Sequence, residues 1–583
     1  MSDTPHTNNA SDATPEDNGT SDATETVASP PASQQTTDIE PQSAHPTIGV
    51  LASGFAGLVA ALAALAAGEF LASLAAPRPG PVTAVANRVV DNAPTWFVEL
   101  GKNIFGLADK PALVAGTIIL SALFGFGLGV AARRRFPLGL AGLGFFGLLG
   151  MLAIGVDAQG SWPLAIIANL GAVAIGGAAL WLILYKARST PQPATSDRTP
   201  GGTNPTANPP IAASIIDPAY SRRRFISTAA GIGASSVVTA AAANFIRQRA
   251  TVVDARNTVQ LAKPAGTTTE TTTRLVEAEL GPVASTPGIT PIIMPNDDFY
   301  LIDTAILVPQ VNPNDWSLQI NGMVDNPLEI SYQELLDRST LVETVTLSCV
   351  SNEVGGSLVG NAVWQGVALT DLLDEAGINP NATQIASWSV DGWSCGFPTD
   401  LAYDGRVAMV AVGMNDEPLP LAHGFPARLV VSGLYGYVSA TKWLNTIELT
   451  TLEDFDGYWI PRGWSKLGPV KLQSRIDTPR NGSSISVGEQ VAVAGVAWAP
   501  NTGIKAVEVK IGDDDWREAE LGDSLGIHAW RQWRLNWTPA TAGSHLIRVR
   551  AINETGETQT SAVAQPAPNG ASGWHTIEVH ASA

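Results

Sequence analysis

Charge, cysteine and histidine are scarce in this chain of 583 residues. Charged residues make up 15% of it against 45% hydrophobic residues, which is little charge for a purely soluble protein. The net charge of −19 argues against nucleic-acid binding, because phosphate neutralisation needs clustered lysine and arginine. Two cysteines, Cys349 and Cys395, cannot make a disulfide framework, although a single bridge between them is an open alternative in an exported domain.

Residues 1–45 lack lysine and arginine and have almost no large apolar side chain. A segment of this composition cannot bury enough surface to offset the entropy lost on ordering, so we expect a disordered acidic tail. It also lacks the basic start of a secretory signal peptide, which predicts that it is not a cleaved leader.

Long apolar runs, by contrast, fill much of the chain before residue 250. Four runs in residues 46–188 are each near or above the roughly 20 residues that cross a bilayer, and they predict a four-span transmembrane domain surrounded by membrane lipid. Residues 220–249 hold a fifth, Ala/Gly/Ser-rich run that predicts one more span. The stretch Val82–Phe105 carries four charged residues and predicts an interfacial or re-entrant piece. The five runs are Ile48–Ala76, Ala112–Ala132, Leu138–Val156, Trp162–Tyr185 and Phe225–Ile246.

Basic residues beside these runs predict their orientation. Arg133–Arg135 follows the second run and Arg222–Arg224 precedes the fifth, whereas the link Asp157–Ser161 has no basic residue. Because loops rich in lysine and arginine stay in the cytoplasm, both basic loops are expected inside. Everything after Arg249 is then expected on the extracytoplasmic side of the cell membrane.

Composition also divides the rest of the chain. Residues 189–219, rich in Pro, Thr, Asn and Gly, predict a flexible linker, and the Thr-rich residues 250–285 predict an extended tether. Residues 286–465 mix strand and helix patterns and predict an α+β domain. Residues 466–583 carry short β runs between Gly, Asn and Asp turns, which is typical of an immunoglobulin-like β-sandwich.

Local signals place three elements inside the α+β part. Ser331–Arg338 predicts a helix with serine as its N-cap. Thr370–Ala376 predicts a second short helix that ends at Gly377. Val342–Cys349 predicts a strand that ends on the cysteine, so the thiol is expected where a strand passes into a loop.

Three short motifs follow one another in this α+β part: Thr346–Asn352 (TLSCVSN), His423–Arg428 (HGFPAR) and the pair Lys442 and Trp443. A thiolate selects soft or high-valent metals, and arginine and lysine bind phosphate. The set suits a metal held by an anionic organic cofactor. It resembles the sulfite oxidase family of molybdopterin enzymes, and the resemblance covers about half the chain, from roughly Thr286 onward.

The resemblance implies a role for each matching residue. Cys349 would ligate molybdenum and act in catalysis, while Cys395 lies outside the ligand motif and is expected in the core. His423, Arg428 and Lys442 would hold the pterin and its phosphate. The β-sandwich would correspond to the family's dimerisation domain, so a homodimer is a further expectation. The remaining implied site residues are Asn296, Asp297, Tyr300 and Thr441 for the cofactor and Tyr458 for catalysis.

Two departures from the family pattern bear on the substrate. Sulfite oxidases follow the ligand cysteine with arginines that bind sulfite, whereas this chain has Asn352, Glu353 and Val354. A carboxylate in that place would repel a sulfite anion. Leu301 and Ile302 stand where the family has another arginine. The resemblance therefore implies the cofactor and a small-molecule substrate without naming that substrate.

Histidine scarcity bears on how electrons are carried. The chain has no Cys-x-x-Cys-His sequence for a c-type haem, and only His6 and His45 precede residue 423. Neither lies in an apolar run, so the membrane part cannot supply the paired histidines of a b-type haem. We expect no haem, and electrons would pass through a separate carrier or through quinone.

The segment Ser221–Ile226 (SRRRFI) resembles the twin-arginine export signal, here internal. That route moves folded proteins, which suits a domain that acquires its cofactor in the cytoplasm. The alternative is a basic flank on an ordinary span.

These observations together predict a membrane-anchored oxidoreductase of sulfite oxidase type that transfers an oxygen atom to or from a small sulfur oxyanion or sulfoxide. One alternative is a cofactor-free binding or structural module on a membrane platform. Another gives the membrane part its own activity, because Glu69 lies inside the first run, where a carboxylate is costly unless it is functional, paired or able to reach the interface.

Overall fold

The computed structural model describes residues 49–94, 108–186, 222–249, 251–264 and 281–583, with a few positions between 95 and 107. All of these belong to one compact unit, residues 47–583. The acidic tail, the linker 189–219 and residues 265–280 of the tether lie outside the described residues.

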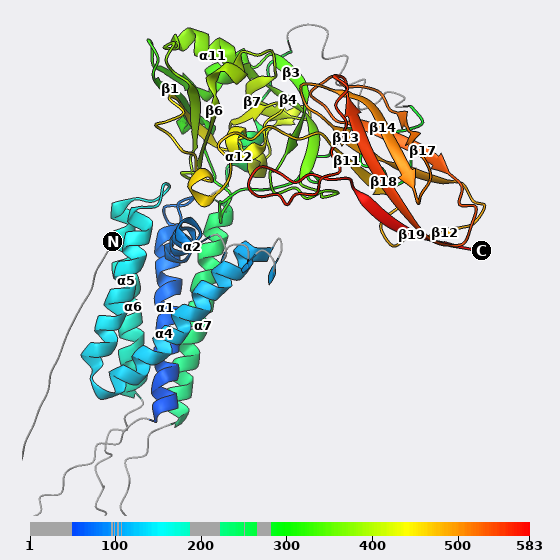
Figure 1. The fold of residues 1–583 in the computed structure, drawn as a ribbon. Coiled ribbons are helices and arrows are strands. Elements are labelled where there is room, and N and C mark those ends of the chain that lie inside the picture. The colour runs from blue at the N-terminus through cyan, green and yellow to red at the C-terminus, as the bar shows by residue number, and fades with distance from the viewer. Residues whose placement is uncertain are drawn as a thin grey trace, which may run out of the picture. The chain divides into compact units, whose positions relative to one another are not determined.

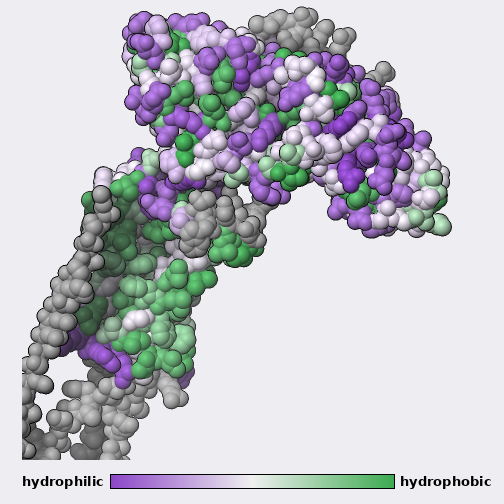
Figure 2. All heavy atoms as spheres, in the orientation of Figure 1, coloured by the Kyte–Doolittle hydropathy of each residue, from purple (hydrophilic) through white to green (hydrophobic). Residues whose placement is uncertain are grey.

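Five long helices come first in the chain (Figure 1). By length and composition each could cross a membrane, as the five apolar runs predicted. The buried positions of the first helix are all Gly, Ala or Ser, which lets neighbouring backbones approach closely. Hydrophobic side chains cover the visible face of these helices (Figure 2). The helices are α1 (Val50–Ser73), α4 (Asp109–Arg134), α5 (Phe136–Gly155), α6 (Trp162–Lys186) and α7 (Arg222–Arg249).

The short helix α2 (Pro81–Asn92) lies between α1 and α4 in the chain, where an interfacial piece was expected. One Glu69 oxygen, Oε1, accepts the backbone N–H of Val82 at 2.7 Å, and the other, Oε2, pairs with Arg247 of α7 at 2.6 Å. Glu69 therefore caps α2 and links α1 to α7. Of the three explanations for a carboxylate in this run, the structure shows an ion pair.

Residues 317–450 fold around two β-sheets. The predicted helices are present: α10 (Tyr332–Arg338) has a capping box on Ser331, and α11 (Leu369–Ala376) ends at Gly377 with φ of +71°. The first sheet has the order β2 (Leu328–Ser331), β1 (Ser317–Gly322), β10 (Leu444–Thr450), β5 (Gln384–Ser389), β6 (Ser394–Pro398). The second has the order β3 (Leu341–Ser348), β4 (Val359–Ala368), β7 (Ala408–Met414), β8 (Glu417–Pro418), with β9 (Arg428–Val431) paired to β7.

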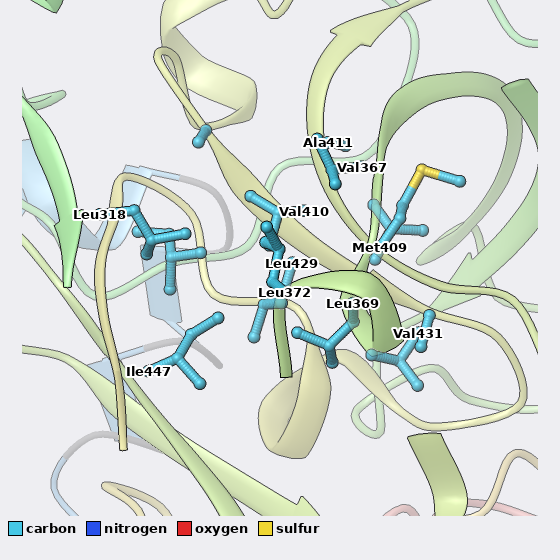
Figure 3. Packing of buried hydrophobic residues seen from close by; sticks show 14 of the residues in the cluster. Leu318, Val367, Leu369, Leu372, Met409, Val410, Ala411, Leu429, Val431 and Ile447 are labelled. Carbon is cyan, nitrogen blue, oxygen red and sulfur yellow. The ribbon is translucent and has the colours of Figure 1, made fainter. Parts of the chain in front are cut away.

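One hydrophobic core joins the two sheets. Figure 3 shows Leu369 and Leu372 of α11 beside Val410 and Leu429 of the second sheet. Leu318 and Ile447, from neighbouring strands of the first sheet, belong to the same cluster. The core fixes both sheets against each other, so loops at their ends are held on a rigid frame.

Residues 473–582 form two further sheets, as the sandwich pattern predicted. Trp498, Trp530 and Trp533 are buried in or beside them. Trp530 joins this part to the preceding domain, since its indole N–H donates to the Ile292 carbonyl at 2.8 Å. The sheets are β11 (Gln473–Thr478), β13 (Val491–Trp498), β17 (Arg531–Trp537), β16 (Glu520–Leu521), and β12 (Ser484–Ser486), β19 (Thr576–Ser582), β18 (Gly543–Asn553), β14 (Ile504–Ile511), β15 (Arg517–Glu518).

Two features differ from what the sequence suggested. The first half of the tether is not extended throughout, because residues 253–257 form the short helix α8 (Val253–Asn257). Arg256 fixes this helix by donating to the carbonyls of Leu419 and Pro418 and pairing with Glu417 at 2.9 Å. The alternative of a bridge between the cysteines is also excluded, since Cys349 and Cys395 form no disulfide.

Candidate active site

Cys349 lies directly after β3, at the start of the loop that leads to β4. Its backbone N–H donates to the Leu358 carbonyl at 2.9 Å, and its carbonyl accepts from Asn352 at 3.0 Å. The Asn352 side chain in turn accepts the N–H of Leu358 at 2.8 Å. These bonds close the loop tightly and hold the thiol against a cavity, although Cys349 itself is only 9% exposed.

The cavity has cations at its wall and a largely aromatic lining. Four of the residues that the family resemblance implied line it together: Cys349, Tyr300, Arg428 and Lys442. Several other lining residues were not predicted from the sequence, notably Asp303, Asp391, Trp393, Trp459 and Trp464.

Arg428 is the first residue of β9 and is 4% exposed. Its guanidinium donates to the His423 carbonyl at 3.1 Å and lies 4.9 Å from the Trp364 ring centroid. Burial lowers its pKa to about 10, so it stays charged at neutral pH. Among the described residues no carboxylate neutralises it, which suits a site for an anionic group.

Lys442 is paired within the wall of the same cavity. Its ammonium donates to Asp303 Oδ2 at 2.7 Å and to the Ala422 carbonyl at 3.0 Å. Burial raises the pKa of Asp303, but Lys442 and Lys110 outweigh that effect and leave it lowered. The pKa of Lys442 is lowered, mainly by burial. The 2.7 Å contact is that of a buried ion pair.

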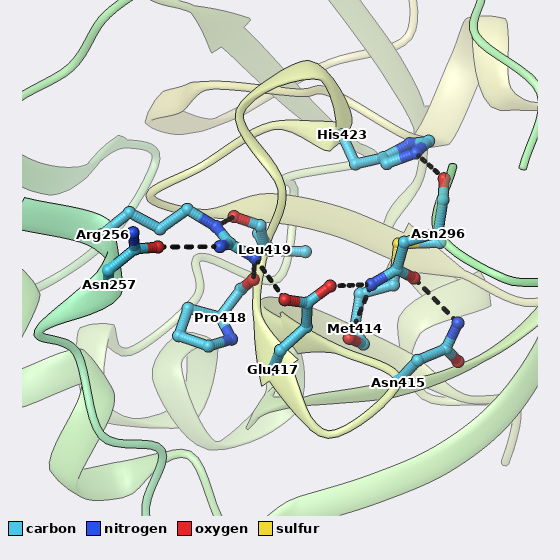
Figure 4. Close-up of polar contacts among 9 residues, drawn as sticks. All are labelled: Arg256, Asn257, Asn296, Met414, Asn415, Glu417, Pro418, Leu419 and His423. Atoms are coloured by element: carbon cyan, nitrogen blue, oxygen red, sulfur yellow. Dashed lines mark hydrogen bonds and ion pairs between the residues drawn. The ribbon is translucent and has the colours of Figure 1, made fainter. Parts of the chain in front are cut away.

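His423 ends the 3₁₀ turn η4 (Leu421–His423) and is 3% exposed. Gly424, with φ of +112°, turns the chain toward Arg428 and leaves no room for a side chain beside Lys442. The ring nitrogen Nε2 lies 2.8 Å from the Asn296 carbonyl and so donates to it (Figure 4). The other nitrogen, Nδ1, is buried and has no hydrogen-bond partner among the residues described. Burial lowers the His423 pKa to about 4, so Nδ1 is an unused acceptor at neutral pH.

Asn296 acts through its backbone at this place. Its side chain binds the Met414 carbonyl at 3.3 Å, and its amide oxygen accepts from Asn415 at 2.8 Å (Figure 4). Those contacts fix the carbonyl that orients His423. Asp297, next in the chain, is exposed and does not line the cavity.

Thr441 and Cys395 lie in the layer behind the cavity rather than in its lining. The Thr441 hydroxyl is 2.7 Å from that of Ser387 and 3.2 Å from the Cys395 sulfur. Burial raises the Cys395 pKa to about 11, so its thiol remains protonated. Thr441 thus positions the start of the Lys442 segment, and Cys395 packs in the core.

Tyr458 also lies outside the lining. Its hydroxyl is 3.4 Å from Asp91 of α2, and the Arg462 guanidinium lies 3.7 Å from its ring centroid. The tyrosines of the cavity are Tyr300 and Tyr437. The role of Tyr458 in catalysis stays a prediction from the resemblance.

Comparison with known proteins identifies the family of this domain. A family model described as the oxidoreductase molybdopterin binding domain matches residues 305–459, and a bacterial Ig domain model matches residues 473–549. An uncharacterized oxidoreductase of Bacillus subtilis, YuiH, is 33% identical over 153 residues, which cover 26% of this chain and 74% of that protein. The chain belongs to the sulfite oxidase family of molybdopterin oxidoreductases.

Other members of the sulfite oxidase family align over longer stretches. Mitochondrial sulfite oxidase of Drosophila melanogaster is 29% identical over 288 residues, 41% of this chain and 49% of that protein. The human mitochondrial enzyme is 27% identical over 346 residues, 50% of this chain and 62% of that protein. The chain thus spans only about half the length of the first of these relatives.

The residues of the cavity fit the molybdopterin that this family binds. A thiol, a buried lysine and a buried arginine line one space, and no carboxylate among the described residues pairs with that arginine. The same arginine donates to the backbone carbonyl of His423, whose Nδ1 is an unused acceptor. A thiolate can ligate a metal, buried cations can bind phosphate and an unprotonated imidazole nitrogen can accept an N–H, so these residue types suit such a cofactor.

The substrate end of the site departs from the sulfite oxidase pattern in a different way from that expected. Glu353 is exposed and does not line the cavity, whereas the carboxylates of Asp303 and Asp391 do. Trp393 is brought in by the turn at Asp391, whose carboxylate accepts its N–H at 3.1 Å. Asp391 and Trp393 belong to the DGW sequence beside Cys395, and that sequence is the signal that could have pointed to them.

Proposed function

We propose that this protein is a membrane-anchored, molybdopterin-dependent oxidoreductase whose catalytic domain lies outside the cytoplasm. The observation that carries the proposal is the convergence of Cys349, Arg428 and Lys442 on one cavity. A cofactor-free binding module would have no need of a buried arginine such as Arg428, to which the described residues offer no carboxylate partner, because such a charge is costly without an anionic ligand.

Each cavity residue would have a distinct part in holding the cofactor. Cys349 would ligate molybdenum through Sγ, and Arg428 and Lys442 would bind the phosphate. His423 would accept an N–H of the pterin at Nδ1. When bound, the cofactor supplies oxygen-atom transfer coupled to two electrons.

The chain would orient the substrate and exclude water. Burial raises the pKa of Tyr300 far above neutrality, and the nearby Cys349 adds to the effect, so its hydroxyl remains a hydrogen-bond donor. Burial also raises the pKa of Asp391, which prepares its carboxylate to take up a proton. Trp459 and Trp464 wall the opening with apolar surface.

We further propose a small sulfur compound as substrate, with a neutral sulfoxide favoured over sulfite. Reduction of a sulfoxide takes up two electrons and two protons and releases water. Oxidation of sulfite consumes water and releases two electrons and two protons. The Asp391 carboxylate and four tryptophans in the lining favour a neutral, partly apolar substrate over a divalent anion. No haem is expected, so electrons would come from a separate carrier or from quinone.

Two measurements on the full-length protein in detergent test the function. Elemental analysis should find about one molybdenum per chain, and a protein without molybdenum would support the cofactor-free module instead. A panel of sulfoxides and sulfite should then be assayed with an artificial electron donor or acceptor. We expect faster turnover with sulfoxides than with sulfite.

Location outside the cytoplasm has its own test. Replacing Arg222 and Arg223 with lysine keeps the flanking charge that sets orientation but removes the guanidinium pair that a twin-arginine receptor reads. The catalytic domain should then stay protected from protease added to wall-stripped cells. A domain that stays accessible and active outside would show that the motif is only a basic flank.

A further inference from the structure

Asp303, in the cavity wall, is held by two lysines from distant parts of the chain. Lys442 Nζ lies 2.7 Å from Asp303 Oδ2, and Lys110 Nζ lies 2.6 Å from Asp303 Oδ1. Lys110 also donates to the Ala305 carbonyl at 2.8 Å. Lys110 belongs to the first turn of α4, one of the five helices apolar enough to span a membrane.

The end of α4 that carries Lys110 is the one expected outside. Arg133 and Arg134 form the last turn of α4, and their charge predicts that end to be cytoplasmic. The opposite end, with Lys110, is then extracytoplasmic, on the side proposed for the catalytic domain. The contact with Asp303 therefore agrees with an orientation that was derived from sequence alone.

The charges at this place explain why a second lysine is needed. A phosphate monoester carries between one and two negative charges at neutral pH. Lys442 paired with Asp303 has no net charge, which would leave Arg428 as the single cation for such a group. Lys110 neutralises Asp303, so the three side chains together carry one positive charge that Lys442 can offer to a ligand.

The exposed fractions of the three side chains fit a lysine that faces the ligand and a second lysine that supports it from outside. Lys442 is 9% exposed, Asp303 is 19% exposed and Lys110 is 33% exposed. Lys442 is thus the innermost group, and Lys110 closes the cluster from outside. Its ammonium is tied to the wall by Asp303 and the Ala305 carbonyl rather than directed into solvent.

We propose that Lys110, a residue of the membrane-anchoring part, belongs to the cofactor site: by neutralising Asp303 it frees Lys442 to bind the pterin phosphate and so retains the cofactor. This rests on the proposed function. It gives the membrane part a role beyond anchoring, because the phosphate end of the pocket is complete only with a group from α4.

A charge-balanced set of variants tests the idea on full-length protein in detergent. The variants are Lys110→Met, Asp303→Asn and the double variant, and the measurement is loss of pterin and molybdenum over time in cofactor-free buffer. Pterin is followed by the fluorescence of its oxidised form, which needs no turnover. Arg88→Met removes a cation that pairs with Asp91, 3.5 Å away, instead of Asp303, and serves as the matched control.

Lys110→Met should lose cofactor about tenfold faster than the unmodified protein, as expected for one weakened charge-assisted contact. Asp303→Asn should retain cofactor at least as well, because Lys442 then keeps its charge without help. The double variant should behave like Asp303→Asn, and Arg88→Met should behave like the unmodified protein.

A purely mechanical link predicts the opposite pattern. Asp303→Asn breaks both ion pairs, so it should then lose cofactor as fast as Lys110→Met does. The double variant should not restore retention. Either of these results, or normal retention in Lys110→Met, would overturn the proposal. If Lys110→Met does not accumulate, Asp303→Asn alone still separates the two explanations. Absence of pterin from the unmodified protein would instead refute the proposed function.

Discussion

The wall of the cavity and the layer directly behind it contain similar polar residues, but they differ in how fully those residues are bonded within the protein. In the wall, Cys349 faces a space and Arg428 has no carboxylate partner among the described residues. Behind the wall, Cys395 is held by two hydroxyls, and Asn296 uses its whole side chain on neighbouring backbone and side-chain groups.

That difference separates a site from its support. Buried polar groups are nearly always satisfied, so an unsatisfied one in the wall of a cavity is a candidate for contact with a ligand. Composition cannot show this difference, because one cysteine lies in the cavity wall and the other behind it, and nothing in the composition distinguishes them. Variants in matched pairs, one from the wall and one from behind it, test whether the distinction holds.

The two cysteines should give the largest contrast. Cys349→Ser should abolish turnover, because the substitution removes the metal ligand with little change in packing. Cys395→Ser should retain most activity and lose at most about 1 kcal/mol of stability, since a hydroxyl can keep the bonds to Ser387 and Thr441. Turnover and thermal unfolding are the measurements, and an inactive Cys395→Ser with an active Cys349→Ser would reverse the ligand assignment.

A pair of arginines should give the next largest contrast. Arg428→Ala should lower molybdenum content, because a lost charge-assisted contact costs about 1.5–3 kcal/mol, while turnover per bound molybdenum stays the same. Arg406→Ala removes an arginine that is already paired with Asp404 at 2.7 Å, and should leave molybdenum content unchanged. Normal content with reduced turnover in Arg428→Ala would make it a substrate contact instead.

The pH dependence of stability should sharpen the contrast further. The folded pKa of His423 is about 4, below its ordinary 6.5, so between these values the unfolded chain binds the proton and the folded chain does not. Stability should therefore fall as pH drops from about 6.5 to 4, by about 2–3 kcal/mol in the cofactor-free protein.

Denaturant unfolding at several pH values measures this effect. His423→Gln should lose that part of the slope. His545→Gln, which changes a half-buried histidine of the β-sandwich, should keep it. An identical slope in His423→Gln and the unmodified protein would show that the unused imidazole is not buried as described.

Elements governed by local chemistry were predictable, and those governed by tertiary contact were not. The capping box at Ser331 and the left-handed glycine Gly377 fixed two helix ends from a few neighbouring residues. Strand β4 has ten residues that are nearly all buried, so it lacks the alternation that marks a half-exposed strand. Nothing near it in the sequence announces such a strand.

The site followed the same rule. The motifs of Cys349, Arg428 and Lys442 were recognisable because each is local, and the structure brings them to one cavity. Asp303 and Lys110 were invisible, because 193 positions separate the partners of their ion pair. Ion pairs between distant positions have no sequence spacing to detect, so only the folded chain reveals them.

The tyrosines should show the smallest difference, and they test the boundary of the site. Tyr300 lines the cavity, whereas the Tyr458 hydroxyl makes only a long contact of 3.4 Å with Asp91. Tyr300→Phe should lower kcat because a donor near the substrate is lost. Tyr458→Phe should change kcat by less than about threefold, since a hydrogen bond of that length contributes little. Steady-state kinetics of both variants decides the point, and a large loss in Tyr458→Phe would mean that its ring turns into the cavity during turnover.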